Sequence, residues 1–161
     1  MNFKFKRNPL TYGEITFKGT LQLFKELDVK KGDLFCDIGS GYGKLTVAYQ
    51  QYFNNKAYGI EISEEKYNTA KNIWKIYNSK YEFIYGDYKD HFNILDKCKF
   101  IYCNGICFPE EIINPLFEYM AKRKTPGVLI HNNHLGRSSA KIPLSVDWGC
   151  GESIYYKLIT N

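Results

Sequence analysis

The feature that most constrains the fold is an alternation of short apolar runs with longer amphipathic segments. Each apolar run has the length of a strand, and the segments between the runs carry apolar residues at helical spacing. Strands that alternate with helices form a parallel sheet whose crossover helices cover both faces. The predicted strands span residues 33–38, 56–62, 81–87, 98–104 and 127–132, and the predicted helices span residues 43–53, 63–78 and 109–121.

Two flanking segments complete the predicted α/β domain. The pattern of residues 16–27 indicates a leading helix. After the last parallel strand, two strand-like runs, 141–149 and 152–160, surround a Gly-Cys-Gly turn and predict an antiparallel hairpin. Pro115 is expected to weaken or kink the last helix early on. We therefore expect one domain over residues 1–161, with an N-terminal loop and leading helix in residues 1–30 and the core in residues 31–161.

Composition narrows the class of protein. The 161 residues are 44% hydrophobic and 24% charged, an ordinary balance for a globular domain with its own core. No apolar run approaches the roughly 20 residues that cross a bilayer, and the basic start MNFKFKRNPL lacks the apolar centre of a signal peptide. We expect an intracellular protein, nuclear or cytoplasmic, without membrane contact. The net charge of +5 permits weak contact with nucleic acid, and nothing in the sequence predicts an oligomeric state.

The five cysteines predict free thiols. Their number is odd and there is no C-x-x-C pair. Cys36 lies inside an apolar run, which places it in the core. Cys103 and Cys107 are four residues apart, and residues 131–134 include two histidines, but a zinc site would require these segments to converge on one tetrahedral centre. We therefore expect no metal site.

The stretch DLFCDIGSGYGK at residues 33–44 predicts a strand that enters a glycine-rich ligand loop. A nucleoside-triphosphate loop ending in Gly-Lys requires Gly at position 38 and Ser or Thr at position 45, where Ile38 and Leu45 stand. The dinucleotide fingerprint matches at two glycines, but its third position is Lys44, which weakens that alternative without excluding it. Glycine here allows a sharp turn and a close approach of backbone to a ligand.

Acidic residues end the first three predicted strands, and together they suggest S-adenosylmethionine as the ligand. Asp37 could meet the ammonium of the methionine end, directly or through water. Glu61 could accept both ribose hydroxyls, and Asp87 could accept the adenine amino group. Because ligands of open parallel sheets bind beyond the carboxyl ends of the strands, these acids are expected to share one site. The alternatives are a solvated strand end for Glu61 and a helix or turn cap for Asp87.

Four segments resemble one family, the disruptor-of-telomeric-silencing (Dot) family of histone-lysine methyltransferases that lack a SET domain. They are TYGEITFKGTLQLFKEL, GDLFCDIGSGYGK, IYCNGICFPEE and SVDWGCGESIYYKLIT. The tripeptide Tyr-Gly-Glu upstream of the glycine loop is the most specific of these signals. The resemblance covers nearly the whole chain. It implies a class I methyltransferase (Rossmann-like) fold, with S-adenosylmethionine as cofactor and S-adenosylhomocysteine as product.

The resemblance also implies roles for individual residues. Asn104 would lie near the transferred methyl group and also contact the cofactor, while Trp148 and Tyr156 would line the channel for the substrate lysine. The remaining cofactor contacts would come from the N-terminal loop, the glycine loop and the ends of two strands: Tyr12, Glu14 and Ile15; Asp37, Gly39, Ser40, Gly41 and Lys44; Glu61; and Asp87 with Tyr88.

The sequence departs from the family pattern in several places. Gly105 stands where a second Asn is expected, and His131 with Asn132 stands where the pattern has another polar pair. The helical domain that precedes the core in the family, and the basic tail that follows it, have no counterpart in these residues. These outer parts help family members to hold a nucleosome, so their absence from these residues bears more on nucleosome docking than on methyl transfer.

The chemistry implied is methylation of a lysine amine, which must be neutral in order to attack. A narrow apolar channel disfavours the charged ammonium, so a dedicated base is not required. His131 is the one titratable residue there that could take a proton near neutral pH, against an alternative role in packing or hydrogen bonding. A histone is the leading substrate. A methyltransferase acting on RNA, another protein or a small molecule is the alternative, and a non-catalytic binding module is a third hypothesis.

Overall fold

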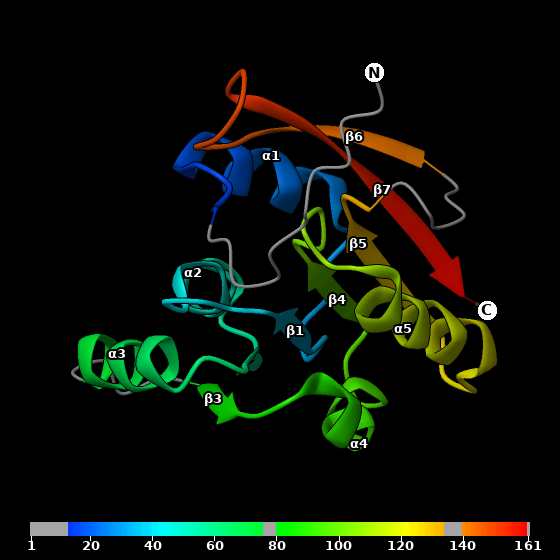
Figure 1. The fold of residues 1–161 in the computed structure, drawn as a ribbon, viewed down its shortest axis with the longest axis horizontal. Coiled ribbons are helices and arrows are strands. Elements are labelled where there is room, and N and C mark those ends of the chain that lie inside the picture. Colours follow the sequence, from blue (N-terminus) through cyan, green and yellow to red (C-terminus); the bar gives the residue numbers. More distant parts are fainter. Residues whose placement is uncertain (1–12, 76–79, 134–139, 161) are drawn as a thin grey trace.

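The centre of the fold is a seven-stranded sheet (Figure 1), and the computed structural model describes residues 13–75, 80–133 and 140–160. The first five strands are mutually parallel, and the last two form an antiparallel pair joined to the fifth. The predicted α/β class is therefore confirmed. Across the sheet the strands are β3 (Tyr81–Tyr85), β2 (Ala57–Glu61), β1 (Phe35–Ile38), β4 (Phe100–Cys103), β5 (Gly127–His131), β7 (Glu152–Thr160) and β6 (Ala140–Ser145).

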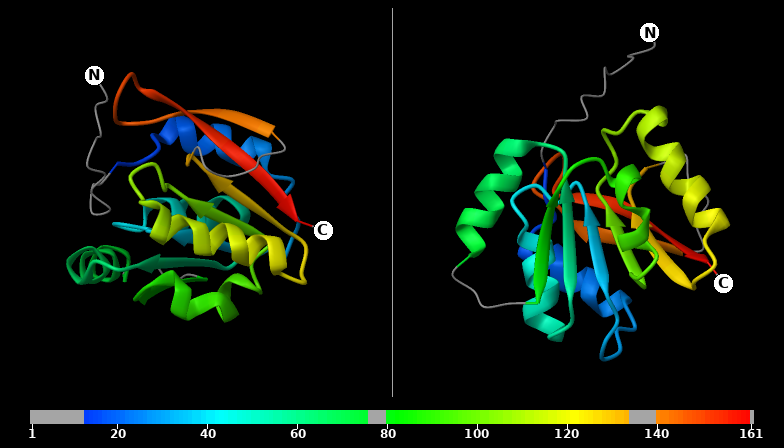
Figure 2. Two further views of the ribbon diagram at one scale, coloured as in Figure 1. Left: turned by 45° about the vertical axis from the view of Figure 1, so that its right-hand side comes forward. Right: turned by 90° about the horizontal axis from the view of Figure 1, so that it is seen from below.

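Helices cover both faces of this sheet (Figure 2). One layer contains α1 (Phe17–Glu26) and α2 (Lys44–Phe53), which pack against β6 and β1, while α3 (Glu64–Trp74) packs along the β2–β3 edge. The other layer contains α5 (Glu110–Lys122), the 3₁₀ helix η1 (Tyr88–His91) and the short α4 (Phe92–Leu95). No described helix has the length and apolar character that a membrane crossing demands.

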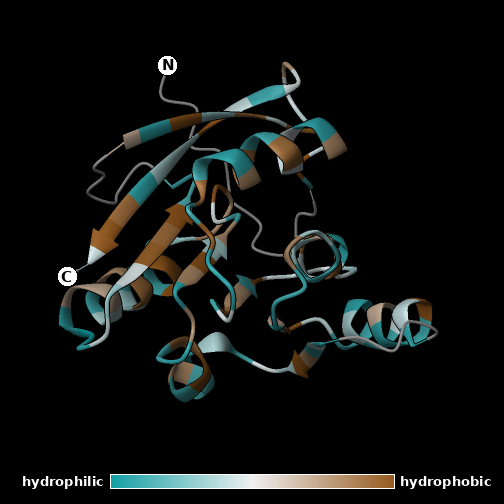
Figure 3. Ribbon diagram, turned by 180° about the vertical axis from the view of Figure 1, so that it is seen from behind, coloured by the Kyte–Doolittle hydropathy of each residue, from teal (hydrophilic) through white to brown (hydrophobic). Residues whose placement is uncertain are grey.

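Alternate residues of the central strands pack into two separate cores. Phe35 and Tyr102 join the core under α1 and α2, whereas their neighbours Cys36 and Ile101 join the core under α5. This division follows from the two-residue period of a strand. In Figure 3 the central strands are mainly hydrophobic, and the helices mix hydrophobic and hydrophilic residues along their length. Cys36 is fully buried, as predicted.

The predicted elements are present, with small shifts of their ends. The strand predicted over residues 81–87 ends at Tyr85, and the following Gly86 has φ of 145°. The helix predicted over residues 63–78 ends at Trp74, and its last predicted residues lie outside the described ones. Pro115 does not end α5, whose face of Ile113, Leu116 and Met120 is fully buried in the core. Neither η1 nor α4 was predicted.

The chain order places a switch point between β1 and β4. From β1 the chain builds outwards through β2 to β3, and then returns to add β4 on the other side of β1. Connections leaving β1 and β4 therefore diverge at their carboxyl ends, which opens a crevice where ligands bind in folds of this kind.

Close packing of α1 on β6 depends on Gly19. A Cβ at this position would lie 2.1 Å from the carbonyl oxygen of Ser145, so the helix and strand touch through backbone. Thr16 strengthens the same contact, because its N–H donates to the Ser145 carbonyl oxygen at 2.9 Å and its hydroxyl donates to the Ser145 hydroxyl at 2.8 Å.

Replacing Gly19 by Ala is expected to lower the free energy of unfolding by about 1–3 kcal/mol, because α1 must move away from β6. Urea unfolding followed by circular dichroism measures the change. Lys25→Ala, on the exposed side of the same helix, is the control and should change stability by less than about 0.5 kcal/mol. A Gly19→Ala variant as stable as the wild type would contradict the close contact.

Candidate active site

Two adjoining cavities lie at the switch point, with volumes of about 230 Å³ and 170 Å³. Gly13, Gly39 and Asn104 line both of them, so the cavities meet at these three residues. The first cavity extends between α1 and α2 and the second between β2 and the segment that follows β3. We call the two adjoining cavities together the switch-point cleft.

The glycine loop between β1 and α2 forms the floor of this cleft. Gly39, Gly41 and Gly43 have φ of 72°, 54° and 79°, a region that other residues rarely adopt. A Cβ at Gly43 would also lie 2.3 Å from the ring of Phe83, so no larger residue fits there. The loop was predicted from its glycines, and the backbone explains why each of them is glycine.

Glu61 fixes the loop from the end of β2. Its Oε2 accepts from the N–H of Gly41 at 2.7 Å, and its Oε1 accepts from the N–H of Ser63 at 2.8 Å. The residue is buried and lines the second cavity. Glu61 is therefore not a solvated strand end. Each carboxylate oxygen can accept a further hydrogen bond, so the side chain can also serve a ligand.

Asp87 and Tyr88 line the outer part of the second cavity. Asp87 is the N-cap of η1, where its side chain accepts from the N–H of Lys89 at 3.0 Å, and it forms an ion pair with the ammonium of Lys89 at 3.1 Å. The capping alternative is thus correct, and the same residue faces the cavity. The Tyr88 hydroxyl donates to the carbonyl oxygen of Ile112, which ties η1 to α5.

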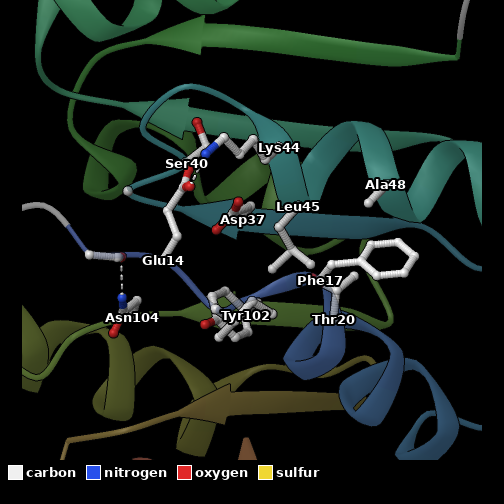
Figure 4. Close-up of a pocket in the computed structure, with 13 residues that line it drawn as sticks. Glu14, Phe17, Thr20, Asp37, Ser40, Lys44, Leu45, Ala48, Tyr102 and Asn104 are labelled. Carbon is white, nitrogen blue, oxygen red and sulfur yellow. Dashed lines mark hydrogen bonds and ion pairs between the residues drawn. The ribbon is translucent and has the colours of Figure 1, made fainter. Parts of the chain in front are cut away.

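Charged side chains gather in the first cavity (Figure 4). Asp37 is buried at the end of β1, where its carboxylate accepts a long hydrogen bond from the Thr46 hydroxyl at 3.5 Å. Burial, and then the negative charges of Glu61 and Glu14, raise the pKa of the Asp37 carboxyl to about 8. A cationic ligand group beside Asp37 would compensate this unfavourable carboxylate.

Two polar groups complete the first cavity. Lys44, at the start of α2, forms an ion pair with Glu14 across the cavity mouth. The Ser40 hydroxyl is buried and has no hydrogen-bond partner among the described residues. A buried hydroxyl without a partner is costly, and a ligand in the cavity could satisfy it. The donors and acceptors present therefore fit a ligand that carries both an ammonium and a carboxylate.

The N-terminal loop closes one side of the cleft and is held by the turn between β6 and β7. The Glu14 N–H donates to Asp147 Oδ1 at 2.8 Å, and the Asp147 N–H donates to the Glu14 carbonyl oxygen at 3.1 Å. A Cβ at Gly13 would lie 2.8 Å from the Trp148 ring, which explains the glycine of the Tyr-Gly-Glu tripeptide. Ile15 lines the first cavity, and Tyr12 lies outside the described residues.

Asn104 begins the loop between β4 and α5 (residues 104–109, the β4–α5 loop) and stands at the junction of the two cavities. Its Nδ2 donates to the carbonyl oxygen of Gly13 at 2.7 Å. Its Oδ1 accepts from Asn132 Nδ2 at 2.5 Å and from the Tyr155 hydroxyl at 3.3 Å. The Tyr155 hydroxyl in turn accepts from that of Tyr102 at 2.9 Å.

Tyr155, and not Tyr156, is the tyrosine of β7 that reaches this network. Successive strand residues point to opposite faces, so only one of the two can face the cleft. Tyr156 lies opposite His131 in the strand register, and its ring stacks on the histidine with centroids 5.6 Å apart. The structure therefore places Tyr155 in the hydrogen-bond network of Asn104, and the role of Tyr156 in the lysine channel stays a prediction.

His131 belongs to the packing under α5. Its ring is fully buried, with an edge-on contact to Phe117 at 4.9 Å between centroids and the stack on Tyr156. This arrangement supports the packing alternative over a proton acceptor at the site. The described residues contain no cluster of His, Cys, Asp and Glu able to hold a metal ion.

Solved structures with the same fold include S-adenosylmethionine-dependent methyltransferases. An RNA methyltransferase from Salinibacter ruber in complex with S-adenosyl-L-homocysteine aligns with a TM-score of 0.68 and 16% identity, over 91% of this chain and 92% of that one. A SAM-dependent methyltransferase from Geobacter sulfurreducens, also with S-adenosyl-L-homocysteine, aligns with a TM-score of 0.57 and 22% identity, over 78% and 49%. At these identities the likeness shows the fold, a Rossmann-like methyltransferase fold.

Sequence similarity identifies the family to which this chain belongs. Residues 4–148 match the family model "Histone methylation protein DOT1", and the chain belongs to that family. A Caenorhabditis elegans "Histone-lysine N-methyltransferase, H3 lysine-79 specific" is 30% identical over 114 residues, 61% of this chain. A protein of the same name from Aspergillus fumigatus is 22% identical over 126 residues, 70% of this chain. The matched regions make up 12% and 25% of those relatives' lengths.

Replacing Asp37 by Asn is expected to stabilise the ligand-free protein by an amount that grows between pH 4 and pH 8. The folded-state carboxyl keeps its proton up to about pH 8, whereas the unfolded chain releases it near its usual pKa of 3.8. Across this window the wild type therefore loses up to about 1.4 kcal/mol of unfolding free energy per pH unit relative to the variant.

Urea unfolding of both proteins at pH 5 and pH 8 measures this difference. Asp28→Asn, at a fully exposed carboxyl, is the control for removing one negative charge. A difference between wild type and Asp37→Asn that is the same at both pH values would contradict the raised pKa of Asp37.

Proposed function

We propose that this chain transfers a methyl group from S-adenosylmethionine to the side-chain amine of a lysine in a protein, with a histone as the leading substrate. The observation that carries the proposal is the switch-point cleft of a DOT1-family chain, with acidic residues at the ends of β1 and β2 and just beyond β3. The fold, the cleft and the family agree on the same class of reaction.

The cofactor would occupy both cavities. In the second cavity, Glu61 would bind the ribose hydroxyls, and Asp87 with Tyr88 would contact the adenine. In the first, Asp37 would face the ammonium of the methionine end, with Gly39, Ser40 and Gly41 of the glycine loop beneath it. Lys44, Glu14 and Ile15 would close the mouth of this cavity. The sulfonium would then lie where the cavities meet.

Bound there, S-adenosylmethionine would supply an activated methyl group. The chain's own contribution is to bind, orient and desolvate the lysine amine. Asn104, at the junction, would orient the amine, and Trp148 beside Gly13 would wall its path together with Tyr155. Holding amine and methyl group in line can supply effective molarities on the order of 10⁵ M or more.

No residue of the network is suited to take the proton of the lysine ammonium. Asn104 does not titrate, and burial raises the pKa of the Tyr102 and Tyr155 hydroxyls, which keeps both as neutral phenols. The amine would therefore lose its proton to water before it enters the site, because a desolvated site disfavours the charged form. Methyl transfer should accordingly become faster as pH rises towards the pKa of free lysine.

A histone is favoured as substrate because the curated relatives are named as H3 lysine-79 specific enzymes. This chain matches only a minor part of those proteins, so docking on a nucleosome is part of the proposal. Action on histones implies action at chromatin, in the nucleus where the cell has one. The likeness to RNA methyltransferases reflects the fold alone, and RNA enters as an outcome of the test.

The test supplies methyl-labelled S-adenosylmethionine together with nucleosomes, core histones or RNA in separate reactions. We expect label on a histone lysine, located by mass spectrometry, and binding of S-adenosylhomocysteine by calorimetry. Label in RNA alone would overturn the lysine assignment. Binding without transfer to any histone would overturn the histone as substrate, and absence of binding would overturn the methyltransferase itself.

Replacing Tyr155 by Phe is expected to lower the methylation rate about five- to tenfold, because Asn104 Oδ1 loses one of its two donors. Tyr156→Phe removes the same hydroxyl from the neighbouring residue on the opposite face, and its rate should stay within about twofold of the wild type. Initial rates on histones measure both variants, and calorimetry checks that they bind S-adenosylhomocysteine equally. A larger loss for Tyr156→Phe would contradict the proposed role of Tyr155.

A further inference from the structure

Two asparagines after β5, Asn132 and Asn133, form hydrogen bonds to the β4–α5 loop. They are 0% and 1% exposed. Asn132 Nδ2 donates to Asn104 Oδ1 at 2.5 Å. Asn133 Nδ2 donates to the carbonyl oxygens of Gly105 at 3.0 Å and Phe108 at 3.5 Å. Neither asparagine lines the two cavities, so any effect on the cleft has to pass through the loop.

Backbone carbonyl groups determine how these amides must point. The carbonyl oxygen of Gly13 can only accept, so the Asn104 atom that faces it is Nδ2. The other end of that amide, Oδ1, then faces Asn132, which has to present its own Nδ2. A donor at position 132 is thus required if Asn104 is to keep its contact with the N-terminal loop.

The oxygen of the Asn132 amide indicates the same requirement for a donor at this position. Asn132 Oδ1 is buried and has no hydrogen-bond partner among the described residues. A buried acceptor left unpaired costs free energy. Asn132 is present in spite of this cost, which indicates that its Nδ2 donor is the part of the side chain that the site needs.

Asn133 acts on the other end of the loop. Gly105 is buried, and a Cβ there would lie 3.1 Å from Ile113 Cδ1 and 3.3 Å from Cys103 Sγ, so the loop packs closely on its surroundings. The ring of Phe108 lies 3.4 Å from the Cβ position of Gly39 and lines the second cavity. By bonding to the Phe108 carbonyl, Asn133 holds this ring over the glycine loop.

We propose that Asn132 and Asn133 are positioning residues of this site: Asn132 sets the orientation of the Asn104 amide for methyl transfer, and Asn133 holds Phe108 over the cofactor cleft. The proposal rests on the proposed function, and it adds residues to which neither the family pattern nor the comparisons give a role. The two asparagines act on different steps, so their variants should separate.

Asn132→Asp tests the first half, because it keeps the shape of the side chain and replaces the donor by an acceptor. The Asn104 amide must then turn over or lose its partner. We expect kcat on histones to fall by on the order of 100-fold. The dissociation constant of S-adenosylhomocysteine should stay within about threefold of the wild type.

A pH series distinguishes positioning from general damage. When protonated, the carboxyl introduced at position 132 regains an O–H donor, and burial raises the pKa of such a carboxyl. The ratio of variant to wild-type kcat should therefore rise severalfold as the pH is lowered from about 9 to about 6. A ratio independent of pH, or a kcat equal to that of the wild type, would overturn the role of Asn132.

Asn133→Asp tests the second half. Its carboxylate would face two carbonyl oxygens, so Phe108 should leave the glycine loop. We expect S-adenosylhomocysteine to bind about tenfold more weakly by calorimetry. Asn93→Asp, at an exposed position of α4, makes the same change of charge and should bind like the wild type. Unchanged binding by Asn133→Asp would overturn its role.

Hydrogen exchange provides a readout that needs neither cofactor nor substrate. Faster exchange is expected at Glu14 and Ile15 in Asn132→Asp and at Phe108 in Asn133→Asp, with no such change in Asn93→Asp. If the wild type binds the product but methylates no histone, the proposed function fails, while these exchange and binding results still decide on the asparagines. If an Asp variant does not fold, Asn132→Ser and Asn133→Ser keep a donor and should retain more rate and affinity, respectively, than the Ala variants.

Discussion

The hydrogen bond from Asn104 Nδ2 to the Gly13 carbonyl oxygen is the interaction on which the geometry of the site depends. It joins residues 91 positions apart in the sequence. Gly13 itself rests against Trp148, in the turn between β6 and β7, and lines both cavities. Three distant parts of the chain therefore meet at one carbonyl group. Because that group can only accept, it dictates the direction of every hydrogen bond in the network beyond Asn104.

The switch-point cleft is built at a cost to the stability of the protein. Asp37 is buried with only a long hydrogen bond from Thr46, and the charges of Glu61 and Glu14 oppose its ionisation. Lys44, at the cavity mouth, forms its ion pair with Glu14 and not with Asp37, so it does not offset the charge of Asp37. Such a carboxylate lowers the free energy of unfolding of the ligand-free protein and strengthens the binding of a cationic group. This loss of stability in return for binding is expected at a ligand site.

Local sequence patterns predicted most of the fold and the acidic residues of the site. Apolar runs and helical spacing are properties of short segments, so the strands, the glycine loop, Glu61 and Asp87 could be placed from them. The choice between Tyr155 and Tyr156 depends on the register of β7 against β5, a long-range property that no short segment contains. The helices η1 and α4 span only four residues each, too few for a periodic signal.

The departures from the family pattern acquire a physical meaning in the structure. A Cβ at Gly105 would be in tight contact with Ile113 and Cys103, and the Gly105 carbonyl oxygen accepts a hydrogen bond from Asn133. Asn132, at the other departure, supplies the donor that Asn104 requires. Gly105 and Asn132 therefore belong to one set of hydrogen bonds, which joins the loop after β4 to the residues after β5.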